Sequence, residues 1–122
     1  MSKIRLKRIY EPPAEQDGYR ILIDRLWPRG ITKEEAHADK WMKDIAPSAE
    51  LRKWFDHMTE KWAAFSTAYE TELKNSESVP EILDLIQSHK TVTLLYASRD
   101  EEHNHGIVLQ KFLNKELDKI SS

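Results

Sequence analysis

Two uninterrupted apolar runs stand out in the pattern of hydrophobic and polar positions along the chain. One is Ile21-Leu22-Ile23 within residues 19–24, and the other is the stretch 91–97, which reads TVTLLYA. Apolar runs that contain β-branched residues and do not alternate are typical of strands buried on both faces of a parallel sheet. We therefore predict central strands at residues 19–24 and 91–97, and we expect them to lie side by side.

Residues 3–10 have a different pattern, because apolar and basic residues alternate there. In an extended chain Ile4 and Leu6 point one way, while the lysines and the arginine around them point the other way. This alternation predicts a strand with one solvated face, near an edge of the sheet. The next residues, 11–18, contain two prolines, an aspartate and a glycine, and we predict that they form a loop.

Much of the remaining chain has apolar residues three or four positions apart, which predicts helices. We expect these helices at residues 48–57, 59–74, 78–89 and 104–120. Ser48 and Ser78 occupy the expected capping positions. The apolar face of the first helix would hold Leu51, Trp54 and Phe55. The apolar face of the last helix would hold Leu109, Leu113, Leu117 and Ile120.

The segment between the first central strand and the first long helix has weaker signals. Thr32-Lys33-Glu34-Glu35 has the form of a capping box, which predicts a short helical turn. Residues 36–47 are predicted to be irregular or partly helical, with Trp41 as an anchor and Pro47 as a stop.

Strands that alternate with helices predict an α/β fold in a single domain spanning residues 1–122. The expected architecture is a small, mainly parallel sheet flanked by helices, in a three-layer sandwich with Rossmann-like topology. Because both central strands would run in the same direction, residues 24–30 and 96–105 should face each other across one crevice. Ligands of open α/β sheets bind at such a crevice, outside the carboxyl ends of the strands.

Composition narrows the class of protein. The chain has no cysteine, which excludes a disulfide framework, a thiolate metal site and a cysteine nucleophile. The first residues have no signal-peptide pattern and no apolar run is long enough to span a membrane, so we expect a cytoplasmic protein. The net charge of −2 argues against a general nucleic-acid binder. Residues 1–33 nevertheless carry eight basic and four acidic side chains, a local charge of +4.

Asp24 and His105 are the candidate catalytic residues of the predicted crevice. Asp24 directly follows a buried strand, where a carboxylate could serve as a general base or hold a ligand hydroxyl. An ion pair with a nearby arginine, or a cap on the next turn, is the alternative for Asp24. His105 is near the start of the last helix, where the helix dipole favours a neutral imidazole that could act as a general base. Its alternative role is a hydrogen bond to a backbone carbonyl.

Six more residues are candidates for ligand binding in the same crevice: Arg25, Trp27, Arg29, Tyr96, Arg99 and Asn104. The guanidinium fork of arginine matches phosphate or carboxylate in a bidentate geometry, and Gly30 beside Arg29 permits a close backbone approach. Salt bridges to acidic helices are the alternative for the arginines. Trp27 could stack on a ring or pack within its own loop, and Asn104 could simply cap the last helix.

Neither a metal ion nor an organic cofactor is predicted. His103 and His105 are two positions apart on a loop, a spacing that is unspecific for metals, and the sequence fixes no third ligand. With only three glycines, the chain has no glycine-rich phosphate loop and no dinucleotide fingerprint.

Three segments together carry a resemblance to a known family: DRLWPRG at 24–30, PSAELRKWFDH with KWAAFSTAYETEL at 47–73, and LLYASRDEEHNH at 94–105. In this order they resemble the domain-of-unknown-function family 488 (DUF488), and within it the YeaO-like branch of small bacterial proteins. The resemblance covers nearly the whole chain and implies an α/β domain with its patterned residues at two strand ends.

The chain also departs from that family. Many relatives have a cysteine where Tyr96 stands and a Cys-His-Arg motif where Asn104-His105-Gly106 stands, so that only His105 of this motif is kept. A thiol-dependent role of those relatives therefore cannot be transferred to this chain.

Taken together, these patterns lead to one functional hypothesis and one alternative. The first is an α/β protein whose crevice binds an anionic small molecule, such as a nucleotide or a phosphorylated metabolite. Arg25 and Arg29 would hold the anion, while Asp24 and His105 would orient it or move protons in a hydrolytic or transfer reaction. The alternative is a non-catalytic nucleic-acid-binding or regulatory module that uses the basic N-terminal third. No membrane partner is expected.

Overall fold

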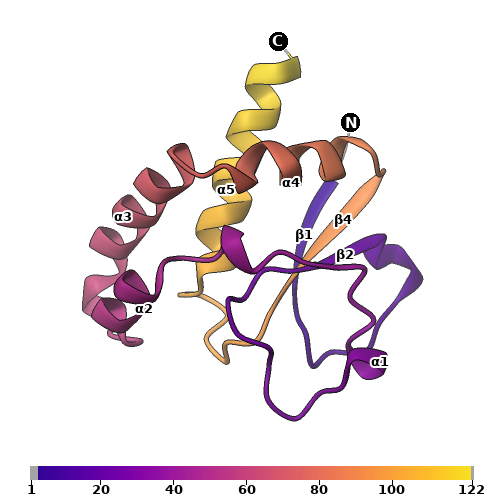
Figure 1. The fold of residues 1–122 in the computed structure, drawn as a ribbon, viewed down its shortest axis with the longest axis horizontal. Helices are drawn as coiled ribbons and strands as arrows, with labels where there is room; N and C mark the ends of the chain where they lie inside the picture. Colours follow the sequence, from indigo (N-terminus) through magenta and orange to yellow (C-terminus); the bar gives the residue numbers. More distant parts are fainter. Residues whose placement is uncertain (1–2, 122) are drawn as a thin grey trace.

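The computed structural model describes residues 3–121, which form a four-stranded sheet and five helices (Figure 1). The strand order is β1-β4-β2-β3, and all neighbouring strands are parallel. The strands are β1 (Lys3–Arg8), β2 (Tyr19–Leu22), β3 (Lys40–Trp41) and β4 (Thr91–Tyr96). The predicted parallel α/β sandwich is confirmed, with β2 and β4 adjacent in its centre and β1 at an edge.

The helices are α1 (Lys33–Ala36), α2 (Ala49–Phe55), α3 (Trp62–Lys74), α4 (Ser78–Gln87) and α5 (His105–Ser121). The predicted capping box at α1 is present, because Thr32 Oγ1 accepts from the Glu35 amide and Glu35 Oε1 accepts from the Thr32 amide. Ser48 caps α2 as predicted. The predicted cap at Ser78 is wrong: Ser78 is already helical, and its amide donates to the Ser76 hydroxyl.

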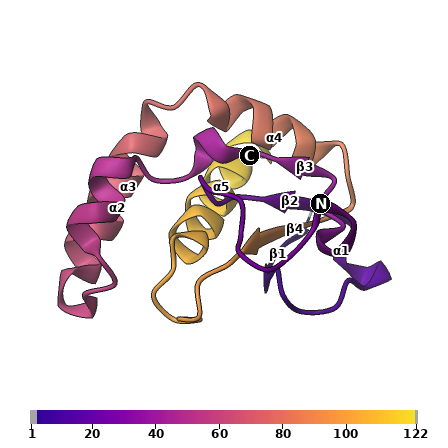
Figure 2. The same ribbon diagram turned by 60° about the horizontal axis from the view of Figure 1, so that its bottom comes forward.

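The helices cover the two faces of the sheet unequally. The larger core joins the side of the sheet formed by Ile21, Ile23, Val92 and Leu94 to apolar residues of α2, α3, α4 and α5. Figure 2 shows α4 and α5 over this face. The second face buries a smaller cluster of Ile9, Leu22, Ala36 and Leu95, where the short helix α1 and connecting segments replace a long helix.

A buried charge cluster completes the second face. Asp17 is only 1% exposed, and its carboxylate accepts from Arg20 Nη1 at 2.5 Å and from Lys7 Nζ at 3.0 Å. The other nitrogens of Arg20 donate to the carbonyls of Ala36 and His37. The connection after β1, predicted as a loop, is therefore fixed to the sheet by paired charges, a feature that the sequence pattern did not reveal.

Several local predictions were wrong. The first central strand ends at Leu22 and not at residue 24, and the two-residue strand β3 lies in a segment predicted to be irregular or partly helical. Its pairing with β2 covers only Ile21 and Leu22, which is too short to leave a periodic pattern. Two apolar residues predicted to lie on the buried faces of helices, Trp54 and Ile120, are exposed at the surface. Trp41 is also partly exposed, but its Nε1 atom donates to the Asp24 carbonyl, so it anchors this segment as predicted.

Between residues 3 and 121, none of the helices is both long and apolar enough to cross a membrane.

Candidate functional site

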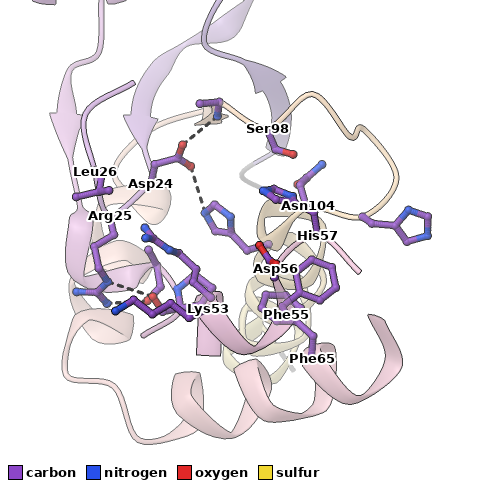
Figure 3. A pocket seen from close by; sticks show the side chains of 16 residues that line it. Asp24, Arg25, Leu26, Lys53, Phe55, Asp56, His57, Phe65, Ser98 and Asn104 are labelled. Carbon is purple, nitrogen blue, oxygen red and sulfur yellow. Dashed lines mark hydrogen bonds and ion pairs between the residues drawn. The ribbon is translucent and has the colours of Figure 1, made fainter. Parts of the chain in front are cut away.

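A cavity of about 480 Å³ opens at the carboxyl ends of β2 and β4, between the loops that follow them, α2 and the start of α5 (Figure 3). We call it the aromatic lobe, and its lining includes Asp24, Arg52, Phe55, His57, Phe65 and His105. In Figure 3, Asp24 and Ser98 lie on one side of the cavity, and Phe55 and Phe65 lie on the other. The two strand ends therefore meet at one crevice, as their parallel direction predicted.

Asp24 is held at this position by backbone contacts on both sides. Its Oδ2 atom accepts from the Ala97 amide at 3.0 Å, and its own carbonyl accepts from Trp41 Nε1 at 2.7 Å. The Oδ1 atom is buried and has no hydrogen-bond partner among residues 3–121. Burial raises the pKa of the Asp24 carboxyl above its ordinary value, although the charges of His105 and Arg52 and the Ala97 amide oppose that rise.

His105, the first residue of α5, contacts this carboxylate. Its Nε2 atom lies 2.9 Å from the Ile23 carbonyl oxygen and 3.4 Å from Asp24 Oδ1. Because a carbonyl only accepts hydrogen bonds, the proton of the neutral ring is on Nε2. Burial lowers the pKa of His105, while the Asp24 charge and the bond to Ile23 act in the opposite direction. The two candidate catalytic residues are therefore in contact, and the carbonyl bond considered as an alternative for His105 is also present.

Asn104 lies beside His105 in the wall of the aromatic lobe, but its side-chain amide makes hydrogen bonds within the protein. Its Oδ1 atom accepts from the Ile107 amide at 3.2 Å, and its Nδ2 atom donates to the Asp100 carbonyl at 3.0 Å. Asn104 is thus the cap of α5, one of the two roles that the sequence left open.

Arg25 also lines the aromatic lobe, but its guanidinium group makes hydrogen bonds within the protein. Its Nε atom donates to the Pro47 carbonyl at 3.1 Å, and its Nη2 atom donates to the Ala46 carbonyl at 3.0 Å. The Nη1 atom lies 3.9 Å from the exposed Asp44 carboxylate. Arg25 therefore fastens the loop after β2 to the segment that precedes α2.

A second cavity of about 740 Å³, which we call the arginine lobe, is lined by Arg8, Arg29 and Arg99. It shares four lining residues with the aromatic lobe, namely Asp24, Leu26, His57 and Ala97. The two lobes are therefore parts of one crevice, and Asp24 lies where they join.

The three arginines of this lobe differ in how they are held. Arg8 donates to the carbonyls of Ser98 and Ala97 at 2.9 and 3.3 Å. The guanidinium groups of Arg29 and Arg99 are exposed, and neither makes a hydrogen bond or an ion pair within the described residues 3–121. These two groups are therefore available to a ligand.

The two aromatic candidates are used in packing. Trp27 borders the arginine lobe, but its Nε1 atom donates to the Ile31 carbonyl at 2.8 Å and its ring packs on the smaller core. Tyr96 is 5% exposed, belongs to the larger core and is absent from the lining of both lobes. Gly30 has φ 75°, and a methyl group there would meet no atom within 4 Å, so its backbone angle and not a close protein contact favours glycine.

Two arginines that line the crevice, Arg8 and Arg52, were not among the candidates from the sequence. Arg8 could have been found, because β1 is parallel to β4 and its carboxyl end must reach the same edge of the sheet. Arg52 has no comparable signal, since it is one of several charged residues on α2, yet its charge acts on both Asp24 and His105. His57, which matched the family's middle segment, lines both lobes.

A metal centre has no support from the described part of the chain. Among residues 3–121, no group of three or more histidine, aspartate or glutamate side chains is arranged to hold a metal ion. His103 Nδ1 is paired with the Asp100 carboxylate at 3.1 Å.

Fold and site together define a parallel α/β protein with a two-lobed crevice at the carboxyl ends of its central strands. The family model described as the inactive DUF488-N3 subclade matches residues 3–121, and the chain belongs to this family. The uncharacterized protein YeaO of Escherichia coli K12 is 44% identical over 110 residues, which cover 90% of this chain and 96% of the relative.

Mycobacterial proteins are also similar. The uncharacterized protein Rv3073c of Mycobacterium tuberculosis H37Rv is 38% identical over 113 residues, covering 93% of this chain and 95% of the relative. The uncharacterized protein Mb3100c of Mycobacterium bovis has the same identity and coverage. No solved structure matches the chain significantly.

Proposed function

We propose that this protein binds an anionic small molecule, a nucleotide or another phosphorylated metabolite, in the two-lobed crevice. The observation that carries the proposal is that Arg29 and Arg99 lie in one lobe and that neither guanidinium group has a hydrogen-bond or ion-pair partner within residues 3–121. Guanidinium forks bind phosphate oxygens in a bidentate manner, and a single such pair is stronger than a neutral hydrogen bond.

The charge around the arginine lobe supports an anionic ligand. Its lining contains three arginines and a single carboxylate, Asp24, although the whole chain has a net charge of −2. Arg8 is fixed by two backbone carbonyls, so its positive charge is present without reorganisation. A fixed local excess of positive charge attracts anions even on a protein with negative net charge.

We assign Asp24 and His105 an orienting role and not a catalytic one. The Nε2 proton of His105 is bonded to the Ile23 carbonyl, so a proton transfer through Nε2 would first require this bond to break. The family to which the chain belongs is described as inactive, and the chain has no cysteine that could act as a nucleophile. Asp24 instead orders the crevice, because its Oδ2 atom accepts from the Ala97 amide and its Oδ1 atom lies 3.4 Å from His105 Nε2.

A thermal-shift screen tests the proposal. Inorganic phosphate, ribose 5-phosphate and nucleoside monophosphates would be titrated into the wild type, Arg29→Ala, Arg99→Ala and Lys111→Ala. Lys111→Ala removes the same charge from an exposed position on α5, outside both lobes. We expect a phosphorylated ligand to raise the Tm of the wild type and of Lys111→Ala, with a smaller rise in both arginine variants.

Two results would contradict the proposal. One is a wild type that no phosphorylated compound stabilises, and the other is an equal shift in all four proteins. Phosphorus NMR of a bound ligand distinguishes binding from turnover. A ligand spectrum that stays unchanged over many hours supports an orienting role for Asp24 and His105. A new phosphorus signal supports catalysis.

A further inference from the structure

A histidine at the end of α2 borders both lobes of the crevice. His57 lines the aromatic lobe (Figure 3), and it also lines the arginine lobe together with Arg29 and Arg99. It follows α2 through two successive residues with left-handed backbone, Asp56 with φ 43° and His57 itself with φ 56°. Residues other than glycine adopt this conformation infrequently, although aspartate and histidine tolerate it better than most. This turn brings His57 to the place where the two lobes join.

The imidazole of His57 is accessible to a ligand. The side chain is exposed, and neither ring nitrogen makes a hydrogen bond or an ion pair within residues 3–121. The other two histidines in the lining are engaged: His103 Nδ1 lies 3.1 Å from an Asp100 carboxylate oxygen, and His105 Nε2 lies 2.9 Å from the Ile23 carbonyl oxygen. In the described part of the chain, His57 is therefore the histidine of the crevice that keeps both ring nitrogens for a ligand.

The charges around His57 come from every element that borders the crevice. The cations are Arg8 on β1, Arg25 and Arg29 after β2, Arg52 and Lys53 on α2, and Arg99 after β4; the carboxylates are Asp24 and Asp56. Burial lowers the pKa of His105, so this ring adds no positive charge near neutral pH. Histidine is the side chain that usually changes charge between about pH 5 and 8. An anion bound in the arginine lobe favours a protonated imidazole, because a nearby opposite charge stabilises the charged form.

We propose that His57 is a third contact for the anion at Arg29 and Arg99, and that protonation of His57 tightens binding. This inference rests on the anion site proposed above and adds a residue and a pH dependence to it. The imidazolium N–H groups donate to the anion, as the two guanidinium groups do. Because His57 is exposed, solvent screens its charge, and we expect the affinity to rise about three- to tenfold from pH 8 to pH 5.5.

Sulfate is a suitable probe, because it keeps two negative charges over this pH range. NMR titration of the whole chain with sulfate at constant ionic strength, followed on the backbone amides of residues 97–99, gives the Kd at pH 8 and at pH 5.5. His57→Asn is the test variant, since asparagine tolerates the left-handed backbone and cannot become charged. His103→Asn is the matched control, because His103 borders only the aromatic lobe of the two and is paired with Asp100. The wild type and His103→Asn should bind sulfate more tightly at pH 5.5, whereas His57→Asn should show little change.

The wild type alone provides an independent measurement. If a proton on His57 strengthens sulfate binding, linkage requires that bound sulfate favour this proton by the same factor. Saturating sulfate should therefore raise the pH midpoint of the His57 ring signals by about 0.5 to 1 unit at constant ionic strength, and it should leave the His103 midpoint nearly unchanged.

The results distinguish this inference from the anion site on which it rests. Sulfate binding that Arg29→Ala weakens, with the same pH dependence in the wild type and in His57→Asn, would keep the anion site and overturn the contact with His57. A His57 midpoint that sulfate does not move would also overturn this contact. Absence of sulfate binding at both pH values would overturn the contact, and together with no stabilisation by phosphorylated compounds it would overturn the anion site as well.

Discussion

The Nε2 atom of His105 lies 3.4 Å from Oδ1 of Asp24, although one residue begins α5 and the other follows β2. Burial moves the two groups in opposite directions: it raises the pKa of Asp24 and lowers the pKa of His105. Burial therefore favours the uncharged form of each group, and their mutual attraction offsets only part of this effect. This balance makes the pair sensitive to pH and to single substitutions.

The stability of the protein should fall in mild acid because of His105. Its folded pKa is lower than the ordinary value of 6.5, so below that pH the unfolded chain binds a proton that the folded chain takes up only at lower pH. Stability from this group is complete above pH 6.5 and decreases as pH falls toward the lowered pKa, with a limiting slope of about 1.4 kcal/mol per pH unit.

Urea denaturation of the wild type and of His105→Gln between pH 7.5 and 5 measures this effect. Each protein is compared with its own stability at pH 7.5, which removes the cost of the substitution itself. We expect the wild type to lose more stability than His105→Gln over this range. Parallel curves would mean that His105 takes up its proton equally in the folded and unfolded states.

Replacing Asp24 by asparagine should not weaken the folded protein at neutral pH. The folded pKa of Asp24 is above its ordinary 3.8, so the ionised carboxylate lowers stability at every pH above that value. An amide costs less to bury than a carboxylate oxygen without a partner, so Asp24→Asn should gain roughly 1 kcal/mol at pH 7.5. The gain should shrink toward zero at about pH 3, below the ordinary 3.8, where Asp24 is largely protonated in both states. Chemical denaturation at both pH values decides this, and a large loss at pH 7.5 would show that the carboxylate stabilises the fold.

The charge cluster on the second face should contribute strongly to the stability of the fold. Asp17→Ala leaves Arg20, which is 4% exposed, buried without its carboxylate, so we expect a loss of about 3–5 kcal/mol in the free energy of unfolding. Asp44→Ala is the matched control, because this exposed aspartate only approaches Arg25 at 3.9 Å and should cost less than about 1 kcal/mol. Similar losses in both variants, measured by urea denaturation, would argue against a special role for the buried pair.

Alanine substitutions at Gly18 and Gly30 distinguish a steric clash with a neighbouring residue from the preference of the backbone angles for glycine. Both have positive φ, 65° and 75°, and ψ of Gly18 is −136°, outside the left-handed helical region, so an alanine is strained by roughly 1–3 kcal/mol. At Gly30 a methyl group meets no atom within 4 Å, so Gly30→Ala should cost no more than this. At Gly18 the methyl group would overlap the Thr91 carbonyl oxygen, so Gly18→Ala should cost about 3 kcal/mol or more. Thermal and urea unfolding of the two variants compares them directly, and equal losses would show that the contact with Thr91 relaxes easily.

Some parts of the fold are encoded locally, which is why sequence reasoning could place them. The apolar runs around Ile21–Ile23 and Leu94–Leu95 identify strands buried on both faces, and the capping residues Thr32 and Ser48 mark helix starts through contacts within four positions. Other features depend on distant partners. The two-residue strand β3 exists because Ile21 and Leu22 offer an edge for pairing, and the position of Trp54 on the solvent side of α2 depends on how α2 packs against α3.

Local patterns were enough to predict that Asp24 and His105 lie at the same edge of the sheet, because the two apolar strands and the residues that follow them can be recognised in the sequence. How each polar group is used depends on the tertiary contacts. Arg25 donates to backbone carbonyls, whereas Arg29 and Arg99 have no partner within residues 3–121. In the same part of the chain Asp24 Oδ1 is buried without a hydrogen bond, and Arg8 and Arg52 reach the crevice from other elements. Hydrogen-bond partners and burial arise from contacts between segments that are far apart in the sequence, and no local periodicity records these contacts.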